Sequence, residues 1–173
     1  MDAKCWFEQI NTPEDGISNR HAVICVTGFL SESTDMKNYN WPHLTNYCRA
    51  RNIPLFVLRW ESKNQNDIYQ LMLQQADQND IINMMAQSNK ISDLISAKNI
   101  SAAYKFSKEL ALATKEVFCS TKQTARMSGK LLAHYLASAF YEKDMLAGHT
   151  VSLVGFSLGA QVIKSCLNRL FKI

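Results

Sequence analysis

A strand, a sharp turn and a helix are predicted in the segment VSLVGFSLGAQVIKSCLNRL, residues 151–170. The apolar run that ends at Gly155 is typical of a buried strand, and the apolar spacing from Leu158 onward is typical of an amphipathic helix. Gly155, Ser157 and Gly159 form the pattern G-x-S-x-G at the turn. A serine in such a turn takes a strained conformation, so the residues two positions away must be small. The segment therefore predicts a serine presented at a strand end, in front of a helix N-terminus.

A serine in this position is suited to nucleophilic attack, but its hydroxyl needs a neighbouring base. The backbone amide of Leu158 is expected to be one oxyanion donor, and the helix dipole favours the negative charge that develops there. A second donor is expected after an earlier strand, where Gly28 permits a close turn and the amide of Phe29 or Leu30 faces inward. The alternatives are a glycine-rich turn without chemistry at 155–159 and an ordinary strand-exit glycine at Gly28.

Two further buried strands are predicted upstream. HAVICVTG, residues 21–28, and IPLFVLRWE, residues 53–61, are short apolar runs rich in β-branched residues. A short helix is expected between them over 41–52, and the strand before the serine over 147–155. This order of strands and helices favours a parallel sheet with right-handed crossovers. The expected fold class is therefore α/β, with a three-stranded parallel core and a helical insert between the second and third strands.

The chain is expected to hold one incomplete domain over 21–173, preceded by a polar N-terminal lead-in over 1–20. The segment 64–120 is interpreted as a helical insert. Thr121 and Thr124 are expected to begin the helix that follows it. The methionine-rich part of the insert is interpreted as core or helix packing, with an interfacial membrane helix or lid as the alternative. Over this whole region two or three helices are expected, with bounds near 66–87, 91–118 and 121–143.

Composition narrows the classes of partner and cofactor. The net charge is +4, and the basic residues are scattered without a block of like charges, which indicates a solvated surface and no nucleic-acid partner. No metal-ligand spacing, phosphate loop or nucleotide fingerprint is present, so neither a metal nor another cofactor is expected. The five cysteines form no C-x-x-C pair and are interpreted as reduced thiols, with Cys25 as a small core residue.

The N-terminal residues have no apolar core of a secretory signal, and no run of eighteen apolar residues occurs in the chain. We therefore expect an intracellular protein that is cytoplasmic or peripheral to a membrane.

Several segments together resemble one known family. The matching pieces are ICVTGFL at 24–30, Trp41, LRWE at 58–61, SGKLLAHYLA at 128–137 and TVSLVGFSLGAQVIKSCL at 150–167. They are similar to the transmembrane and coiled-coil domain-containing protein four family, a group of lipase-like proteins long catalogued as a domain of unknown function. The resemblance implies a partial α/β-hydrolase fold and Ser157 as the nucleophile. It also implies an oxyanion hole formed by Leu158 and the Gly28–Phe29 loop. Family members often carry membrane-associated segments between these blocks, where this chain has polar-faced helices.

In that fold the nucleophile is followed by an acid and then by a histidine. The sixteen residues after Ser157 contain no Asp, Glu or His. Of the four upstream histidines, two precede strands at the end far from the serine, and His134 is expected to pack among apolar helix residues. His43 is the least unsuitable base, and Asp35 and Glu61 lie near the expected ligand crevice, although both also suit solvated or capping positions.

We therefore expect a serine-hydrolase-like domain of the esterase or lipase type, truncated after the nucleophile turn, with little or no turnover. An ester or lipid substrate and a peripheral membrane contact are the expected partners. A partner protein or a missing C-terminal segment is expected to cover the open edge of the nucleophile strand. The alternatives are a non-catalytic pseudo-hydrolase and a helical interaction module in which the G-x-S-x-G pattern is incidental.

Overall fold

The computed structural model describes residues 4–11, 20–31, 41–75, 100–139, 146 and 148–172. The chain divides into two compact units, one of Met1–Lys63 with Thr121–Ile173 and one of Asn64–Ser120. The first unit contains the sheet and the candidate site. The loop residue Asp35, most of the methionine-rich stretch, and the helix ends expected over 76–99 and 140–143 lie outside the described residues.

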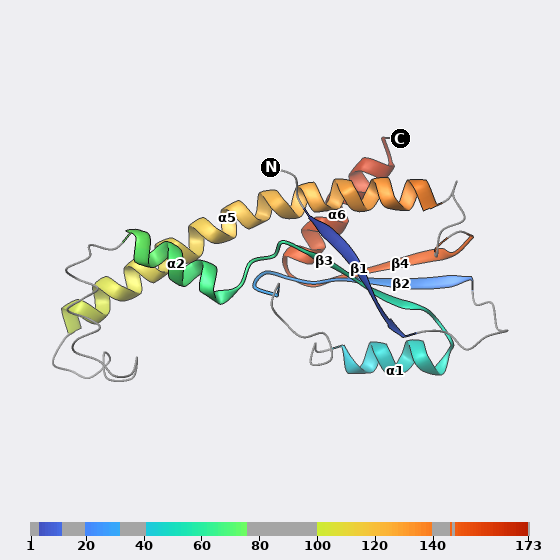
Figure 1. Cartoon of the computed structure of the whole chain (residues 1–173), viewed down its shortest axis with the longest axis horizontal. Coiled ribbons are helices and arrows are strands. Elements are labelled where there is room, and N and C mark those ends of the chain that lie inside the picture. Colours follow the sequence, from blue (N-terminus) through green and yellow to red (C-terminus); the bar gives the residue numbers. More distant parts are fainter. Residues whose placement is uncertain are drawn as a thin grey trace. The chain divides into compact units, whose positions relative to one another are not determined.

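The sheet has four strands in the order β1-β3-β2-β4 (Figure 1). Strand β2 pairs in parallel with both β3 and β4, while β1 pairs antiparallel with β3. Because helices pack on this mixed sheet, the α/β class is confirmed. In the described part of the chain, β4 is an edge strand, and its covering segment or partner remains a prediction. The strands are β1 Cys5–Asn11, β2 His21–Val26, β3 Leu55–Trp60 and β4 Thr150–Gly155.

The expected three-stranded sheet is incomplete, because the polar lead-in supplies β1. Its sequence, CWFEQIN, mixes polar and apolar residues, and each of its side chains remains at least partly exposed. An edge strand of this kind lacks the continuous apolar run that predicts a buried strand. Glu8 joins it to β3 through a 2.8 Å salt bridge to Arg59.

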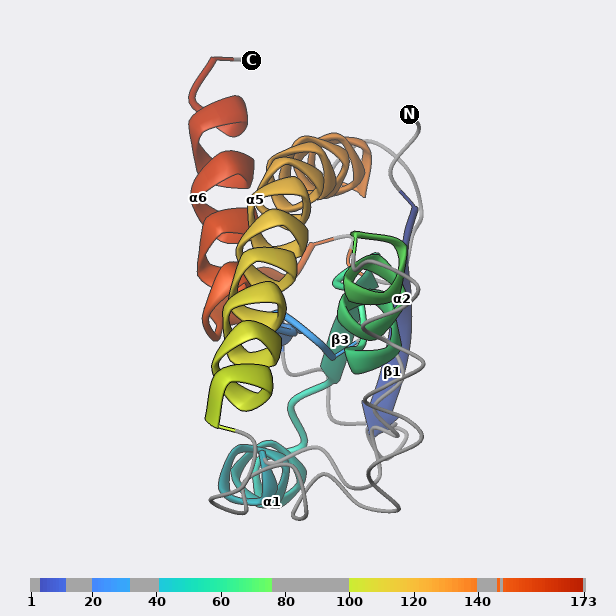
Figure 2. The ribbon, with the colours of Figure 1, turned by 90° about the vertical axis from the view of Figure 1, so that its left-hand side faces the viewer.

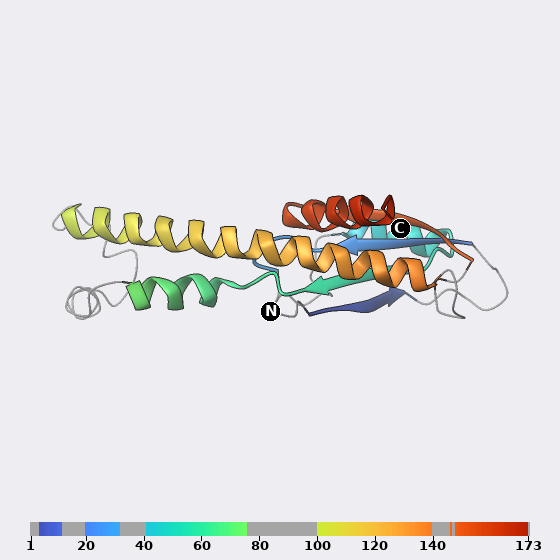
Figure 3. The same ribbon diagram turned by 90° about the horizontal axis from the view of Figure 1, so that it is seen from above.

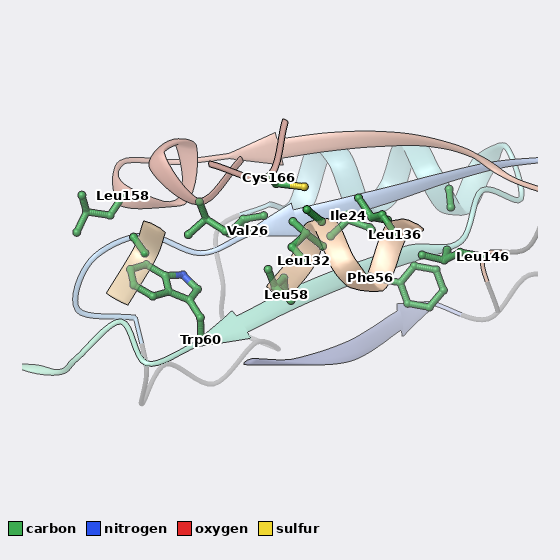
Figure 4. Close-up of a cluster of buried hydrophobic side chains, with 14 residues drawn as sticks. Ile24, Val26, Phe56, Leu58, Trp60, Leu132, Leu136, Leu146, Leu158 and Cys166 are labelled. Atoms are coloured by element: carbon green, nitrogen blue, oxygen red, sulfur yellow. The ribbon is translucent and has the colours of Figure 1, made fainter. Parts of the chain in front are cut away.

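Helices cover both faces of the sheet. Helix α1, Pro42–Ala50, packs on one face (Figure 2). Helix α6, Leu158–Leu170, packs on the other face, together with the part of α5, Ile100–Ala139, that begins at Thr121. Side chains alternate along β2. Ile24 and Val26 therefore enter the larger core under α5 and α6 (Figure 4). Val23 and Cys25 enter the smaller core under α1, which confirms Cys25 as a core residue.

Helix α5 runs unbroken from Ile100 to Ala139, so the helix start expected at Thr121 is wrong. The side chain of Thr121 is fully buried within the helix. A threonine is tolerated in a helix interior when its hydroxyl bonds to a carbonyl one turn back. Thr114 does so in the same helix, where its Oγ1 donates to the carbonyl of Leu110 at 2.7 Å.

The second unit contains α2, Gln65–Gln75, beside the first half of α5 (Figure 3). Asn64 caps α2, because its Oδ1 accepts a hydrogen bond from the amide of Asn66 at 2.8 Å. In return, Oδ2 of Asp67 accepts from the amide of Asn64 at 2.7 Å. This reciprocal pair fixes the start of the helix.

Candidate active site

Ser157 lies in the turn between β4 and α6 with φ 54° and ψ −123°. A residue with a side chain rarely adopts a positive φ, and holding one there costs about 1–3 kcal/mol. The side chain of Ser157 is exposed at the end of the strand. The sequence pattern therefore corresponds to a turn that holds an accessible serine hydroxyl in a strained backbone.

The two flanking glycines allow this turn to form. A Cβ atom on Gly159 would lie 2.3 Å from the carbonyl oxygen of Val26 and 2.7 Å from that of Thr27. A Cβ atom on Gly155 would lie 2.8 Å from the carbonyl of Gly159. These distances are far below van der Waals contact, so the start of α6 rests directly on the end of β2. Neither position therefore has room for a side chain in this turn.

Gly28 brings a second loop against the turn. A Cβ atom on Gly28 would lie 3.2 Å from the Cβ of Ser157 and 3.1 Å from the carbonyl oxygen of Phe156. The pairing of Val26 with Gly155 in neighbouring parallel strands explains this approach, because both strands end at the same edge of the sheet. The structure therefore places Gly28 beside Ser157, as the sequence predicts.

The loop after β2 is anchored by residues from the end of β3. The indole Nε1 of buried Trp60 donates to the carbonyl of Thr27 at 2.9 Å. The amide of Leu30 donates to the carbonyl of Ser62 at 3.0 Å. That amide therefore anchors the loop, and the other expected donor is the amide of Phe29. Its role is still a prediction.

Two buried hydroxyls complete the anchor. Ser31 Oγ donates to the carbonyl of Gly28 at 2.6 Å and lies 3.0 Å from Ser62 Oγ. A hydroxyl has one proton to donate. With the Ser31 proton on Gly28, the hydroxyl of Ser62 donates to Ser31. The sequence predicts none of these three side chains as part of the site, and the only signal is that Ser62 directly follows the segment LRWE at 58–61.

The amide of Leu158 is the first in helix α6. In the ranges described, it makes no backbone hydrogen bond, whereas the next amide, that of Gly159, donates to the carbonyl of Phe156 at 2.8 Å. The buried side chain of Leu158 fixes the helix start against the core (Figure 4). Unbonded amides at a helix N-terminus attract negative charge. This geometry suits the expected oxyanion donor, which remains a prediction.

No described histidine accompanies Ser157. His21 pairs with Thr150, five residues from the Val26–Gly155 pair, which puts it about 17 Å from the turn at about 3.3 Å per residue. His149 precedes Thr150 at that same far end of the sheet. In the described ranges no hydrogen bond joins Ser157 to a histidine or a carboxylate.

The remaining candidates are dispersed. His134 is exposed on α5, so its expected packing role is wrong, because the buried side of the helix is formed by Leu132, Ala133 and Leu136 instead. His43 is exposed on α1, which covers the opposite face of the sheet from α6. Glu61 follows β3 and is half-buried.

A family model described as "Protein of unknown function (DUF726)" matches residues 7–173. The chain belongs to this DUF726 family. No curated protein and no solved structure match it. The DUF726 match begins inside β1, so part of the expected lead-in belongs to the family's domain.

Two buried thiols of this DUF726 chain have raised pKa values. Burial raises the pKa of Cys166 to about 11, and burial with a smaller contribution from Cys48 raises the pKa of Cys25 to about 12. These thiols therefore stay protonated and unreactive at neutral pH. No cluster of three or more histidine, cysteine or acidic side chains that could hold a metal occurs in the described part of the chain. Nor does any helix there have the length and apolar character to cross a bilayer.

Proposed function

We propose that this DUF726 chain is a serine-hydrolase-like domain of the esterase or lipase type, with Ser157 as the nucleophile. The observation that carries the proposal is the strained backbone of an exposed serine at a strand-to-helix turn. Glycine would adopt this conformation without strain, so a purely structural turn would favour glycine at this position. Strain that persists at an exposed polar residue is common at active sites.

The sheet order supports the same proposal. Strand β4, which leads to Ser157, pairs with β2, whose following loop contains Gly28 and Phe29. Neighbouring parallel strands thus deliver the nucleophile and the second donor loop to one edge. This is the arrangement that a partial α/β-hydrolase fold requires.

In the proposed reaction, Ser157 Oγ attacks the carbonyl carbon of an ester. The carbonyl oxygen becomes negatively charged and receives hydrogen bonds from the amides of Leu158 and Phe29, with further stabilisation from the dipole of α6. The proton of the serine hydroxyl passes to water or hydroxide from the solvent during this step, and the tetrahedral intermediate then collapses by breaking the ester C–O bond and releasing the alcohol. Because no described histidine or carboxylate contacts Ser157, we expect slow acylation and little turnover.

That same observation favours a second candidate, a pseudo-hydrolase that retains the turn and binds a partner without turnover. A fluorophosphonate probe with mass spectrometry separates the two. The first candidate predicts an adduct on Ser157 that Ser157→Ala abolishes. The matched control, Ser138→Ala, removes an exposed hydroxyl that bonds only to its own helix and should leave labelling unchanged.

The pH dependence of the labelling rate shows whether a general base activates Ser157. Without a base, the rate should keep rising with hydroxide concentration through the neutral range. A labelling rate that instead reaches a plateau above the histidine pKa of about 6.5 would show that a histidine acts as the general base. An adduct that persists in Ser157→Ala contradicts the assignment, and the absence of an adduct even at alkaline pH favours the pseudo-hydrolase.

A further inference from the structure

Helix α6 and the part of α5 that begins at Thr121 are basic and contain no carboxylates. From Thr121 to Ala139 and from Leu158 to Leu170, the sequence has no Asp and no Glu. Within the described ranges, the salt bridge that is found lies elsewhere, between β1 and β3, so it neutralises none of these cations. We call their exposed cations the basic face: Lys122, Arg126, Lys130, Lys164 and Arg169.

Close packing brings together the two helices that carry these cations. A Cβ atom on Gly129 of α5 would lie 2.3 Å from the carbonyl oxygen of Val162 and 3.0 Å from the amide of Cys166, both in α6. The two helices therefore touch at their backbones and lie side by side (Figure 2). On α5, cations recur at every fourth residue from Lys122 to Lys130, a spacing at which like charges repel. A repulsive row of this kind costs stability, which favours a role in binding.

Large apolar side chains are exposed on the same two helices. Met127 and Leu131 on α5 and Leu167 on α6 each keep 40% of their surface exposed. A binding surface for nucleic acid has little use for exposed methionine and leucine, since it relies on cations, polar groups and aromatic stacking. A membrane interface uses both kinds of side chain, because cations bind lipid phosphates while apolar groups enter the acyl boundary.

We propose that the basic face docks on an anionic lipid bilayer. Complementary charge supplies the attraction, and the exposed methionine and leucines supply the apolar contact. The inference does not depend on the proposed catalytic function, because a vesicle-binding assay needs no turnover.

Co-sedimentation of the full chain with phosphatidylcholine vesicles, with and without phosphatidylserine, tests the proposal. Binding should require phosphatidylserine and weaken as salt is added. The triple variant R126Q/K130Q/K164Q should lose about a hundredfold in affinity, because each cation near the surface contributes about a fivefold gain. Leu131→Ser should weaken binding further at high salt, where the apolar contact dominates.

The matched control K4Q/R20Q/R49Q removes the same charge from exposed positions outside both helices and should bind like the unmodified chain. Equal loss in the two triple variants would overturn the proposal, since net charge alone would then explain binding. Binding to polyglutamate or to single-stranded DNA, without binding to phosphatidylserine vesicles, would overturn it in favour of an acidic protein or a nucleic acid.

Discussion

The turn at Ser157 and the loop after β2 lie at the same edge of the sheet, and both hold a residue at positive φ. Ser157 has φ 54° and Leu30 has φ 62°. The turn depends on the lack of side chains at Gly155 and Gly159, because only glycine lets the backbone segments pack this closely. The loop is held by hydrogen bonds from Trp60 and to Ser62. One half of the site therefore depends on steric fit, and the other on polar partners distant in sequence.

The largest loss of stability is expected when the close backbone packing of the Ser157 turn is disrupted. Gly159→Ala would force a Cβ atom to within 2.3 Å of the Val26 carbonyl. Neither backbone segment can move without disturbing β2 or α6, so we expect a loss of at least about 3 kcal/mol in the free energy of unfolding, measured in urea.

Gly148→Ala is the matched control. Gly148 has φ 76°, and a Cβ atom added there would meet nothing within 4 Å. Only the left-handed conformation is penalised at this position, by about 1–2 kcal/mol. Equal losses in the two variants would show that close backbone approach is not what the turn requires.

The steric half was predictable because its signals are local. The apolar run before Gly155, the G-x-S-x-G pattern and the amphipathic helix all lie within twenty residues. Strand β1 was missed because it lacks an apolar run. The helix break at Thr121 was wrongly predicted because a buried threonine in a long helix resembles a capping threonine in sequence alone.

A smaller loss of stability is expected when a hydrogen bond that anchors the loop after β2 is removed. Trp60→Phe keeps the ring in the core but leaves the buried carbonyl of Thr27 without its 2.9 Å indole donor. An unsatisfied buried group costs about 1–3 kcal/mol, so a loss in that range is expected in urea unfolding. Trp6→Phe, at a side chain 47% exposed, should be nearly neutral. A neutral Trp60→Phe would show that the loop does not need its anchor.

The two buried serines offer the finest test. Ser31→Ala removes the donor to Gly28 and the acceptor for Ser62, whereas Ser62→Ala removes only one donor to Ser31. We expect a loss of about 2 kcal/mol for the first and about 1 kcal/mol for the second by the same measurement. The reverse order would contradict the assigned direction of these hydrogen bonds.

These partners could not be predicted from sequence, because Trp60 and Thr27 are 33 residues apart and meet only through the register of β2 and β3. The basic face is a similar case. Its cations are scattered along the chain, and in sequence alone they indicate a solvated surface. The packing of α5 against α6 at Gly129 brings together the two helices that carry them.

The proposed site depends above all on Ser157 being accessible at the positive end of α6. Ser157→Cys tests this placement through the pKa of the introduced thiol. This pKa is measured from the pH dependence of alkylation by iodoacetamide, in a Cys119→Ser background that removes the exposed native thiol. Ser138→Cys, in the last turn of α5, is the control at the negative end of a helix. We expect fast alkylation and a pKa clearly below the ordinary value of about 8.5 for Ser157→Cys, with a pKa at or above that value for Ser138→Cys. A protected thiol, or equal pKa values at the two positions, would contradict the placement of Ser157 as a nucleophile.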